Sequence, residues 1–123
     1  MSAGDDETLV CRGSWGAVRY AVRASGKMPA RKFIQSLTEP DQRKLAALFQ
    51  RIADHGQIRN REKFRKVVGD IFEFKSFQVR VGCFQLENTW FLTHGFRKKR
   101  DKWPPAEVTR ADQIHSEHMQ RQG

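Results

Sequence analysis

Apolar residues recur with a helical period between residues 45 and 53. The positions i, i+3, i+4, i+7 and i+8 are all apolar: Leu45, Leu48, Phe49, Ile52 and Ala53. This spacing puts the five side chains on one face of a helix. Thr38 can cap the start of that helix, and Gly56 suits its end. The pattern therefore predicts an amphipathic helix between these two residues.

Two more helices are predicted from proline positions and shorter apolar patterns. Pro29 suits the first turn of a helix, because proline lacks the N–H group that would be unpaired there. Its apolar side would consist of Phe33, Ile34 and Leu37. The two prolines at residues 104–105 mark the start of a last helix. Its apolar side would consist of Val108, Ala111 and Ile114.

The period changes to that of strands in two parts of the chain. Residues 17–22 alternate and predict a first strand, and residues 67–74, 78–86 and 90–94 predict three more that form an antiparallel meander. Within the second strand of this meander, side chains alternate between the two faces. Val79, Val81 and Cys83 should share one face, and Arg80, Gly82, Phe84 and Leu86 the other.

The predicted order is strand, helix, helix, three strands, helix. A length of 123 residues fits one domain, which we expect over residues 15–123, after a polar, flexible N-terminal tail at residues 1–14. The sequence has no run of about 18 apolar residues and no basic-then-apolar leader, so we expect no membrane association. Two cysteines exclude a disulfide-rich scaffold and favour the cytoplasm.

Positive charge is concentrated in the second half of the chain. The formal net charge is +9, and residues 59–110 alone hold thirteen basic and six acidic residues. The densest part is the run Arg97, Lys98, Lys99 and Arg100, with Lys102 just beyond. Such an excess favours a polyanionic partner, for example a nucleic acid. The alternative for the basic run itself is a solvated loop.

Several basic side chains should converge where the meander strands end. Lys75 ends one strand, Arg80 lies in the next, and His94 ends the third, just before the basic run. An unpaired guanidinium is costly to bury, so Arg80 should face either a groove or the carboxylate of Glu73 across the hairpin. His94 could act as an acid or base near neutral pH, or simply pack or cap.

The sequence indicates no cofactor and no metal site. It lacks a glycine-rich phosphate loop, a Cys-x-x-Cys pair and clustered carboxylates, and we expect the pair His115 and His118 to lie on a solvated helix face. Phosphodiester cleavage would then have to be metal-free. RNA permits this, because its own 2′-hydroxyl can attack the adjacent phosphate while cations stabilise the developing charge.

Four stretches resemble the RelE/HigB toxins of bacterial toxin–antitoxin modules, and most closely their phage-derived HigB-like branch. They are GKMPARKFIQSL (26–37), IFEFK (71–75), VRVGCF (79–84), and LTHGFRKK (92–99) with PPAEVTRA (104–111). The resemblance implies an α+β fold with a twisted antiparallel sheet flanked by helices. It also implies ribosome-dependent cleavage of messenger RNA and inhibition by a cognate helix-turn-helix antitoxin, and it assigns no oligomeric state.

The resemblance also implies roles for individual residues. Catalysis would involve Arg80, His94, Lys98 and Lys99, and RNA binding would involve Lys75, Arg97, Arg100 and Lys102. The chain departs from the family pattern at Glu73, where some members are basic, and it lacks a tyrosine near the last helix. Two other functions therefore stay open: a gyrase inhibitor like the ParE branch, and an inactive phage remnant that only binds an antitoxin or RNA.

Overall fold

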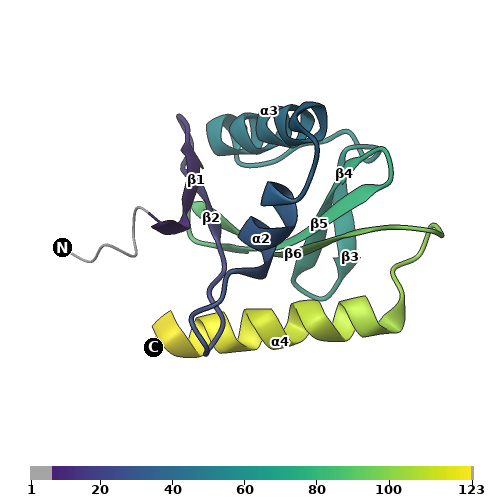
Figure 1. Ribbon diagram of the computed structural model, residues 1–123. Coiled ribbons are helices and arrows are strands. Elements are labelled where there is room, and N and C mark those ends of the chain that lie inside the picture. Colours follow the sequence, from purple (N-terminus) through teal and green to yellow (C-terminus); the bar gives the residue numbers. More distant parts are fainter. Residues whose placement is uncertain (1–6, 123) are drawn as a thin grey trace.

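The alternating stretches of the second half of the chain form most of one six-stranded sheet (Figure 1). The computed structural model describes residues 7–122. The strands are β1 (Leu9–Arg12), β2 (Ala17–Tyr20), β3 (Phe64–Val68), β4 (Ile71–Ser76), β5 (Val79–Leu86) and β6 (Thr89–Arg97). The helices are α2 (Pro29–Gln35), α3 (Glu39–His55) and α4 (Pro105–Gln122).

The sheet has the strand order β1-β2-β6-β5-β4-β3. β3 to β6 form an antiparallel meander, and β1 pairs antiparallel with β2. β2 pairs parallel with β6, with Ala17 opposite Thr89 and Tyr20 opposite Leu92. The predicted α+β class is confirmed, but the sheet is mixed rather than entirely antiparallel.

The sequence prediction differs from the structure at both edge strands. The single strand expected over residues 67–74 is two strands, because a turn at Gly69 and Asp70 reverses the chain between β3 and β4. The flexible tail expected over residues 1–14 is wrong for β1, whose Cys11 pairs with Val18. Residues 1–6 of that tail lie outside the described residues.

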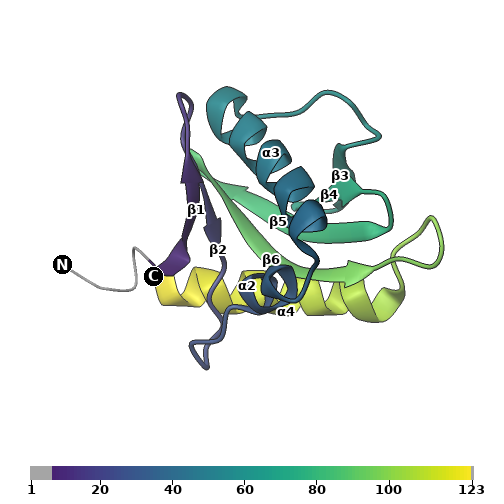
Figure 2. The same ribbon diagram turned by 45° about the horizontal axis from the view of Figure 1, so that its top comes forward.

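Helices cover both faces of the sheet. α2 and α3 pack on one face, where Figure 2 shows α3 lying obliquely over the strands, and α4 runs along the opposite face. The alternation predicted for β5 is confirmed. Val79, Val81 and Cys83 join the core under α2 and α3, whereas Phe84 joins the smaller core under α4. Between Val79 and Phe84, odd-numbered residues of β5 therefore face the α3 side of the sheet and even-numbered residues face the α4 side.

The predicted signals at the ends of α3 are confirmed. The Thr38 hydroxyl accepts a hydrogen bond from the backbone N–H of Asp41 at 3.3 Å. Gly56 ends the helix with φ of 81°, a conformation that glycine adopts without steric cost. All five residues of the predicted apolar face are buried. Among residues 7–122, no helix is long and apolar enough to cross a membrane.

Candidate nucleic-acid interface

The buried carboxylate of Glu73 organises the α4 side of the sheet. Its side chain is fully buried, although it lies on a strand rich in apolar residues. One carboxylate oxygen accepts a hydrogen bond from Trp103 Nε1 at 2.9 Å and lies 3.4 Å from Arg80 Nε. The other oxygen accepts a hydrogen bond from Arg65 Nε. Two hydrogen-bond donors, Arg65 and Trp103, and the nearby positive charge of Arg80 thus compensate the carboxylate for its lost hydration.

Arg80 is buried beside Glu73 and holds the β4–β5 turn. Only 3% of the residue is exposed. Its Nη1 donates to the carbonyl oxygens of Phe77 and Val79, at 2.6 Å and 2.9 Å. The ion pair with Glu73 that the sequence offered as one interpretation is therefore confirmed. In this arrangement Arg80 positions the turn, and only a small part of its side chain is exposed to contact a phosphate.

His94 is buried because of an irregularity in β6. Val81 pairs with Gly95 and Cys83 with Leu92, so Thr93 and His94 both stand opposite Gly82 in a β-bulge. The His94 ring is 1% exposed. Its Nε2 lies 3.1 Å from a carboxylate oxygen of Glu107 on α4.

The environment of His94 keeps the imidazole neutral. Burial, together with the positive charges of Arg110 and Arg23, lowers its pKa to about 4. A neutral ring with its proton on Nε2 donates to Glu107 and leaves Nδ1 to accept from the Thr93 hydroxyl, 3.2 Å away. This geometry matches the packing interpretation of His94, and the acid–base role stays a prediction.

Partly and fully exposed cations gather around the Glu73–Arg80 pair. Lys75 stands opposite Arg80 in the β4–β5 ladder. The backbone N–H of Lys98 donates to the carbonyl of Gln78 at 2.8 Å, which holds the start of the β6–α4 loop against the β4–β5 turn. Arg65 reaches the same loop, because its Nη2 donates to the Asp101 carbonyl at 3.2 Å. We call Arg65, Lys75 and Lys98 the basic cluster.

The charges within the basic cluster affect one another. Partial burial and the positive charges of Arg65 and Arg80 lower the pKa of the Lys75 ammonium group. Lys98 Nζ lies 3.1 Å from a carboxylate oxygen of Asp101, whose side chain is fully in solvent. Such an exposed pair is weak and easily exchanged. An incoming phosphate can therefore replace Asp101 as the partner of Lys98.

The other predicted RNA-binding residues are spread more widely. Lys99, Arg100 and Lys102 are exposed on the loop between β6 and α4. Arg97 lies 3.7 Å from a carboxylate oxygen of Asp41 on α3, so its side chain turns towards the α3 side. The structure thus brings Lys75, Arg80 and Lys98 together, places Lys99, Arg100 and Lys102 beside them, and separates Arg97.

Three features of this region were not predicted from the sequence. Arg65 and Trp103 complete the shell around Glu73, and neither belongs to a local motif. Phe77, at the β4–β5 turn, is 76% exposed and has φ of 55°, which is unusual for an aromatic residue. The sequence did contain a signal for the exposure of Phe77. An aromatic side chain in a two-residue hairpin turn cannot be buried within the hairpin.

The histidines of α4 also differ from expectation. His118 is buried, and its Nδ1 accepts the backbone N–H of Val22 at 3.0 Å, so the solvated helix face predicted for it is wrong. His115 packs on Phe84 with ring centroids 4.2 Å apart. Over residues 7–122, no three His, Cys, Asp or Glu side chains are close enough to hold a metal ion.

Comparison with known families identifies the chain. A model of the family described as phage derived protein Gp49-like (DUF891) matches residues 32–116. The chain belongs to this family. The Gp49-like family is associated with the toxins of toxin–antitoxin modules. Its match runs from α2 into α4 and so includes the basic cluster, Glu73 and His94. No curated protein matches the chain.

Proposed function

We propose that this Gp49-like protein is the toxin of a toxin–antitoxin module, and that it cleaves messenger RNA on the ribosome in the cytoplasm. The observation that carries the proposal is the basic cluster, in which side chains from β3, β4 and the loop after β6 meet at one end of the sheet. Positioned cations of this kind bind a phosphate and stabilise the charge that develops on it. The family association supports the same function.

The reaction would use the 2′-hydroxyl of the RNA as the nucleophile. The 2′-oxygen attacks the adjacent phosphorus, the bond from phosphorus to the 5′-oxygen breaks, and the products are a 2′,3′-cyclic phosphate and a 5′-hydroxyl end. One proton leaves the 2′-oxygen and one reaches the 5′-oxygen. Lys98 and Lys99 would stabilise the negative charge on the phosphate oxygens. Lys75 has a lowered pKa, and so it is the cation of the cluster best suited to exchange a proton.

Arg80 and His94 would act indirectly in this proposal. Arg80 holds the Phe77 carbonyl at the β4–β5 turn, and the turn in turn holds Lys98 through Gln78. His94 joins β6 to α4 through Glu107. Both are therefore positioning residues for the basic cluster. A cognate helix-turn-helix antitoxin would be the protein partner that restrains the activity.

Burial of two predicted catalytic residues supports a second candidate function. Arg80 is 3% exposed and His94 is 1% exposed, so the groups most able to activate a phosphate are covered. A protein with this surface could bind RNA, or a protein such as gyrase or an antitoxin, without cutting. The two candidates differ in the products that they leave on messenger RNA.

The test is inducible expression combined with analysis of RNA ends. We expect the wild type to arrest growth and to produce messenger fragments with 2′,3′-cyclic phosphate and 5′-hydroxyl ends. Lys98→Ala/Lys99→Ala should relieve the arrest, because it removes two charges beside the phosphate. The matched control is Lys27→Ala/Lys32→Ala, which removes two exposed charges, one just before α2 and one in its last turn, and should leave the arrest intact.

A messenger with a 2′-deoxynucleotide at the mapped cut position should resist cleavage in a purified translation system. Cleavage of that messenger would rule out attack by the 2′-hydroxyl. Growth arrest with intact messenger would favour the non-catalytic function, and DNA damage in those cells would indicate gyrase as the target. Equal arrest by the two lysine double variants would show that the basic cluster is not the site.

A further inference from the structure

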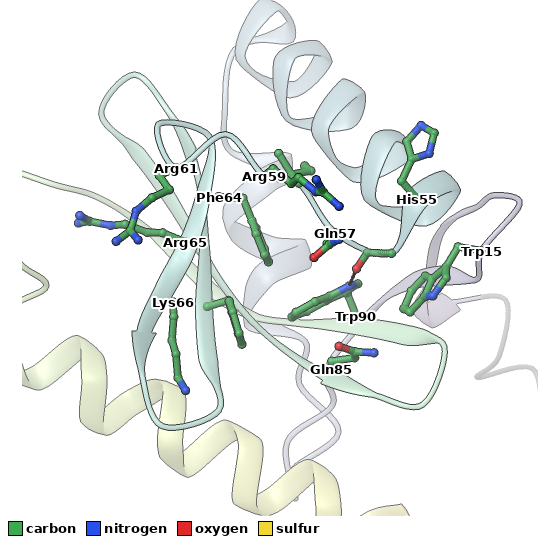
Figure 3. A pocket seen from close by; sticks show the side chains of 13 residues that line it. Trp15, His55, Gln57, Arg59, Arg61, Phe64, Arg65, Lys66, Gln85 and Trp90 are labelled. Carbon is green, nitrogen blue, oxygen red and sulfur yellow. Dashed lines mark hydrogen bonds between the residues drawn. The ribbon is translucent and has the colours of Figure 1, made fainter.

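A second basic region lies on the opposite side of the sheet from α4. A pocket of about 490 Å³ opens between the loop that follows α3 and the strands β3 to β6. Figure 3 shows Gln57 and Arg59 on its α3 side, and Lys66 and Gln85 on its sheet side. The volume lies in the range of about 300–1,000 Å³ that is typical of small-molecule sites. The pocket shares Arg65 with the basic cluster, and the proposed reaction uses none of its other lining residues.

The base of the pocket is a fixed group of aromatic rings. Phe64 and Phe72 stack with ring centroids 5.4 Å apart, and Trp90 meets each of them edge-on at 5.2 Å. Trp90 Nε1 donates to the carbonyl of Gly56 at 3.0 Å, which locks the indole against the end of α3. Phe72 and Trp15 are only half-buried. They leave aromatic surface accessible within a rigid wall.

The rim of the pocket carries cations and no carboxylate. Arg59, Arg61, Arg65 and Lys66 line it, and none of the lining residues is Asp or Glu. Arg65 is engaged by Glu73, whereas Arg59, Arg61 and Lys66 are exposed. Clustering like charges is unfavourable unless an anion is bound between them. Charge complementarity therefore favours a negatively charged ligand with a flat apolar part.

We propose that this pocket binds one unpaired nucleotide of RNA, with its base on the aromatic rings and its phosphate beside Arg59 and Arg61. Aromatic rings next to arginines are the usual means by which proteins hold unstacked bases. The side-chain amides of Gln57 and Gln85 lie where they can bond to the edge of a base. An acidic peptide would satisfy the arginines but would leave the aromatic wall unused.

The pocket lies within reach of the basic cluster across the edge strand β3. Arg65 and Lys66 line the pocket on the α3 side, and they also line a smaller one on the α4 side with Glu73, Lys102 and Trp103. A strand of RNA could therefore pass over β3 with one phosphate at the cluster and a neighbouring base in the pocket. In this respect the inference rests on the proposed function, and it makes the pocket a subsite for a flanking nucleotide.

Binding of short RNA to the purified full chain tests this inference. The probe is a fluorescent single-stranded RNA of five nucleotides, compared with the same probe carrying abasic sugars, and the readout is fluorescence anisotropy. Phe72→Leu should weaken binding of the intact probe about five- to a hundred-fold, which is the usual range for one stacked base. It should leave binding of the abasic probe unchanged.

The arginine rim supplies a second variant that does not disturb the core. Arg59→Ala/Arg61→Ala should weaken both probes about tenfold or more, because it removes two exposed cations beside the phosphate. Lys27→Ala/Lys32→Ala removes the same amount of charge from around α2 and should bind both probes like the wild type. Circular dichroism checks that each variant is folded.

The outcomes separate the pocket from the ribonuclease proposal. If both pocket variants bind RNA like the wild type, the proposed nucleotide site is wrong, whether or not messenger RNA is cut. Equal loss of the intact and abasic probes in Phe72→Leu would overturn base stacking. Loss of antitoxin binding with unchanged RNA binding would show a protein interface instead. Pocket-dependent RNA binding by a protein that cuts nothing would support the pocket and refute the ribonuclease.

Discussion

At the scale of single residues, Glu73 is the position on which the α4 side of the sheet depends. Its carboxylate is fully buried and is shared by Arg65, Arg80 and Trp103. The chain places a negative charge here in a region where its other charges are mostly positive. That charge allows a guanidinium to be buried at the β4–β5 turn, which in turn fixes the loop carrying Lys98.

Replacing Glu73 with glutamine should destabilise the fold strongly. Glu73→Gln keeps the shape of the side chain but leaves the buried Arg80 without a counter-charge. We expect a loss of about 3–5 kcal/mol in the free energy of unfolding, measured by urea denaturation. The matched control is Glu39→Gln on α3, whose exposed pair with Arg43 should contribute less than about 0.5 kcal/mol. A loss below about 1 kcal/mol for Glu73→Gln would contradict the role given to this carboxylate.

At the scale of elements, the β-bulge in β6 decides where His94 lies. Strict alternation would place Thr93 and His94 on opposite faces, whereas the bulge turns both towards α4. The ring then packs edge-on to Trp103 and bonds to Glu107, so it helps to dock the start of α4 on the sheet. Protonation of His94 should weaken this docking.

The lowered pKa of His94 predicts a loss of stability in mild acid. The folded pKa is about 4, below the ordinary value of about 6.5 in the unfolded chain, so the unfolded state binds more protons between these values. Stability is therefore complete above about pH 6.5 and falls as the pH drops towards 4. By about pH 4, the free energy of unfolding has fallen by about 3 kcal/mol because of His94 alone.

The variant His94→Gln isolates this contribution. Glutamine can keep a hydrogen bond to Glu107 but does not titrate, while all other groups titrate in both proteins. Urea denaturation gives the free energy of unfolding at about pH 7 and at about pH 4. Its decrease between these pH values should be about 3 kcal/mol larger in the wild type than in His94→Gln. Identical pH dependence in the two proteins would mean that His94 titrates normally and is not buried as described.

Local patterns predicted the elements better than they predicted the pairing between them. The face of α3, its caps and the alternation of β5 depend on neighbours in sequence, and all were predicted correctly. The turn at Gly69 was missed because the apolar residues on either side of it suggested one continuous strand. β1 was missed because its four residues gain stability from tertiary contacts, by pairing with β2 and packing against the core under α3.

The candidate site was likewise predicted only where local sequence patterns determine it. The meander alone indicates that Lys75, Arg80 and the loop with Lys98 lie close together, since they sit at the ends of neighbouring strands. Arg65 joins them from an edge strand and Trp103 from the loop before α4, so only the tertiary structure reveals them. Burial of His94 likewise depends on a bulge and on α4, neither of which alternation predicts.

At the scale of the whole molecule, which has a net charge of +9, two basic regions lie on opposite faces of the sheet. The basic cluster lies on the α4 side, and the arginines around the aromatic pocket lie on the α3 side, with β3 between them. An RNA strand that contacts both regions would release counterions from several phosphates. Its affinity should then fall steeply as the salt concentration rises.

The salt dependence of RNA binding counts these phosphate contacts. For single-stranded RNA, the slope of log affinity against log salt changes by about 0.7 for each neutralised phosphate. Lys75→Ala and Lys98→Ala should each make the slope shallower by about 0.7, measured by anisotropy with a probe long enough to cross β3. Lys27→Ala should leave the slope unchanged, because its side chain lies in the loop before α2.

If Lys75→Ala and Lys98→Ala lower the affinity without changing the slope, these lysines support the fold and do not contact phosphate. The Lys98 pair with Asp101 makes that distinction necessary, because removing either partner could also move the β6–α4 loop.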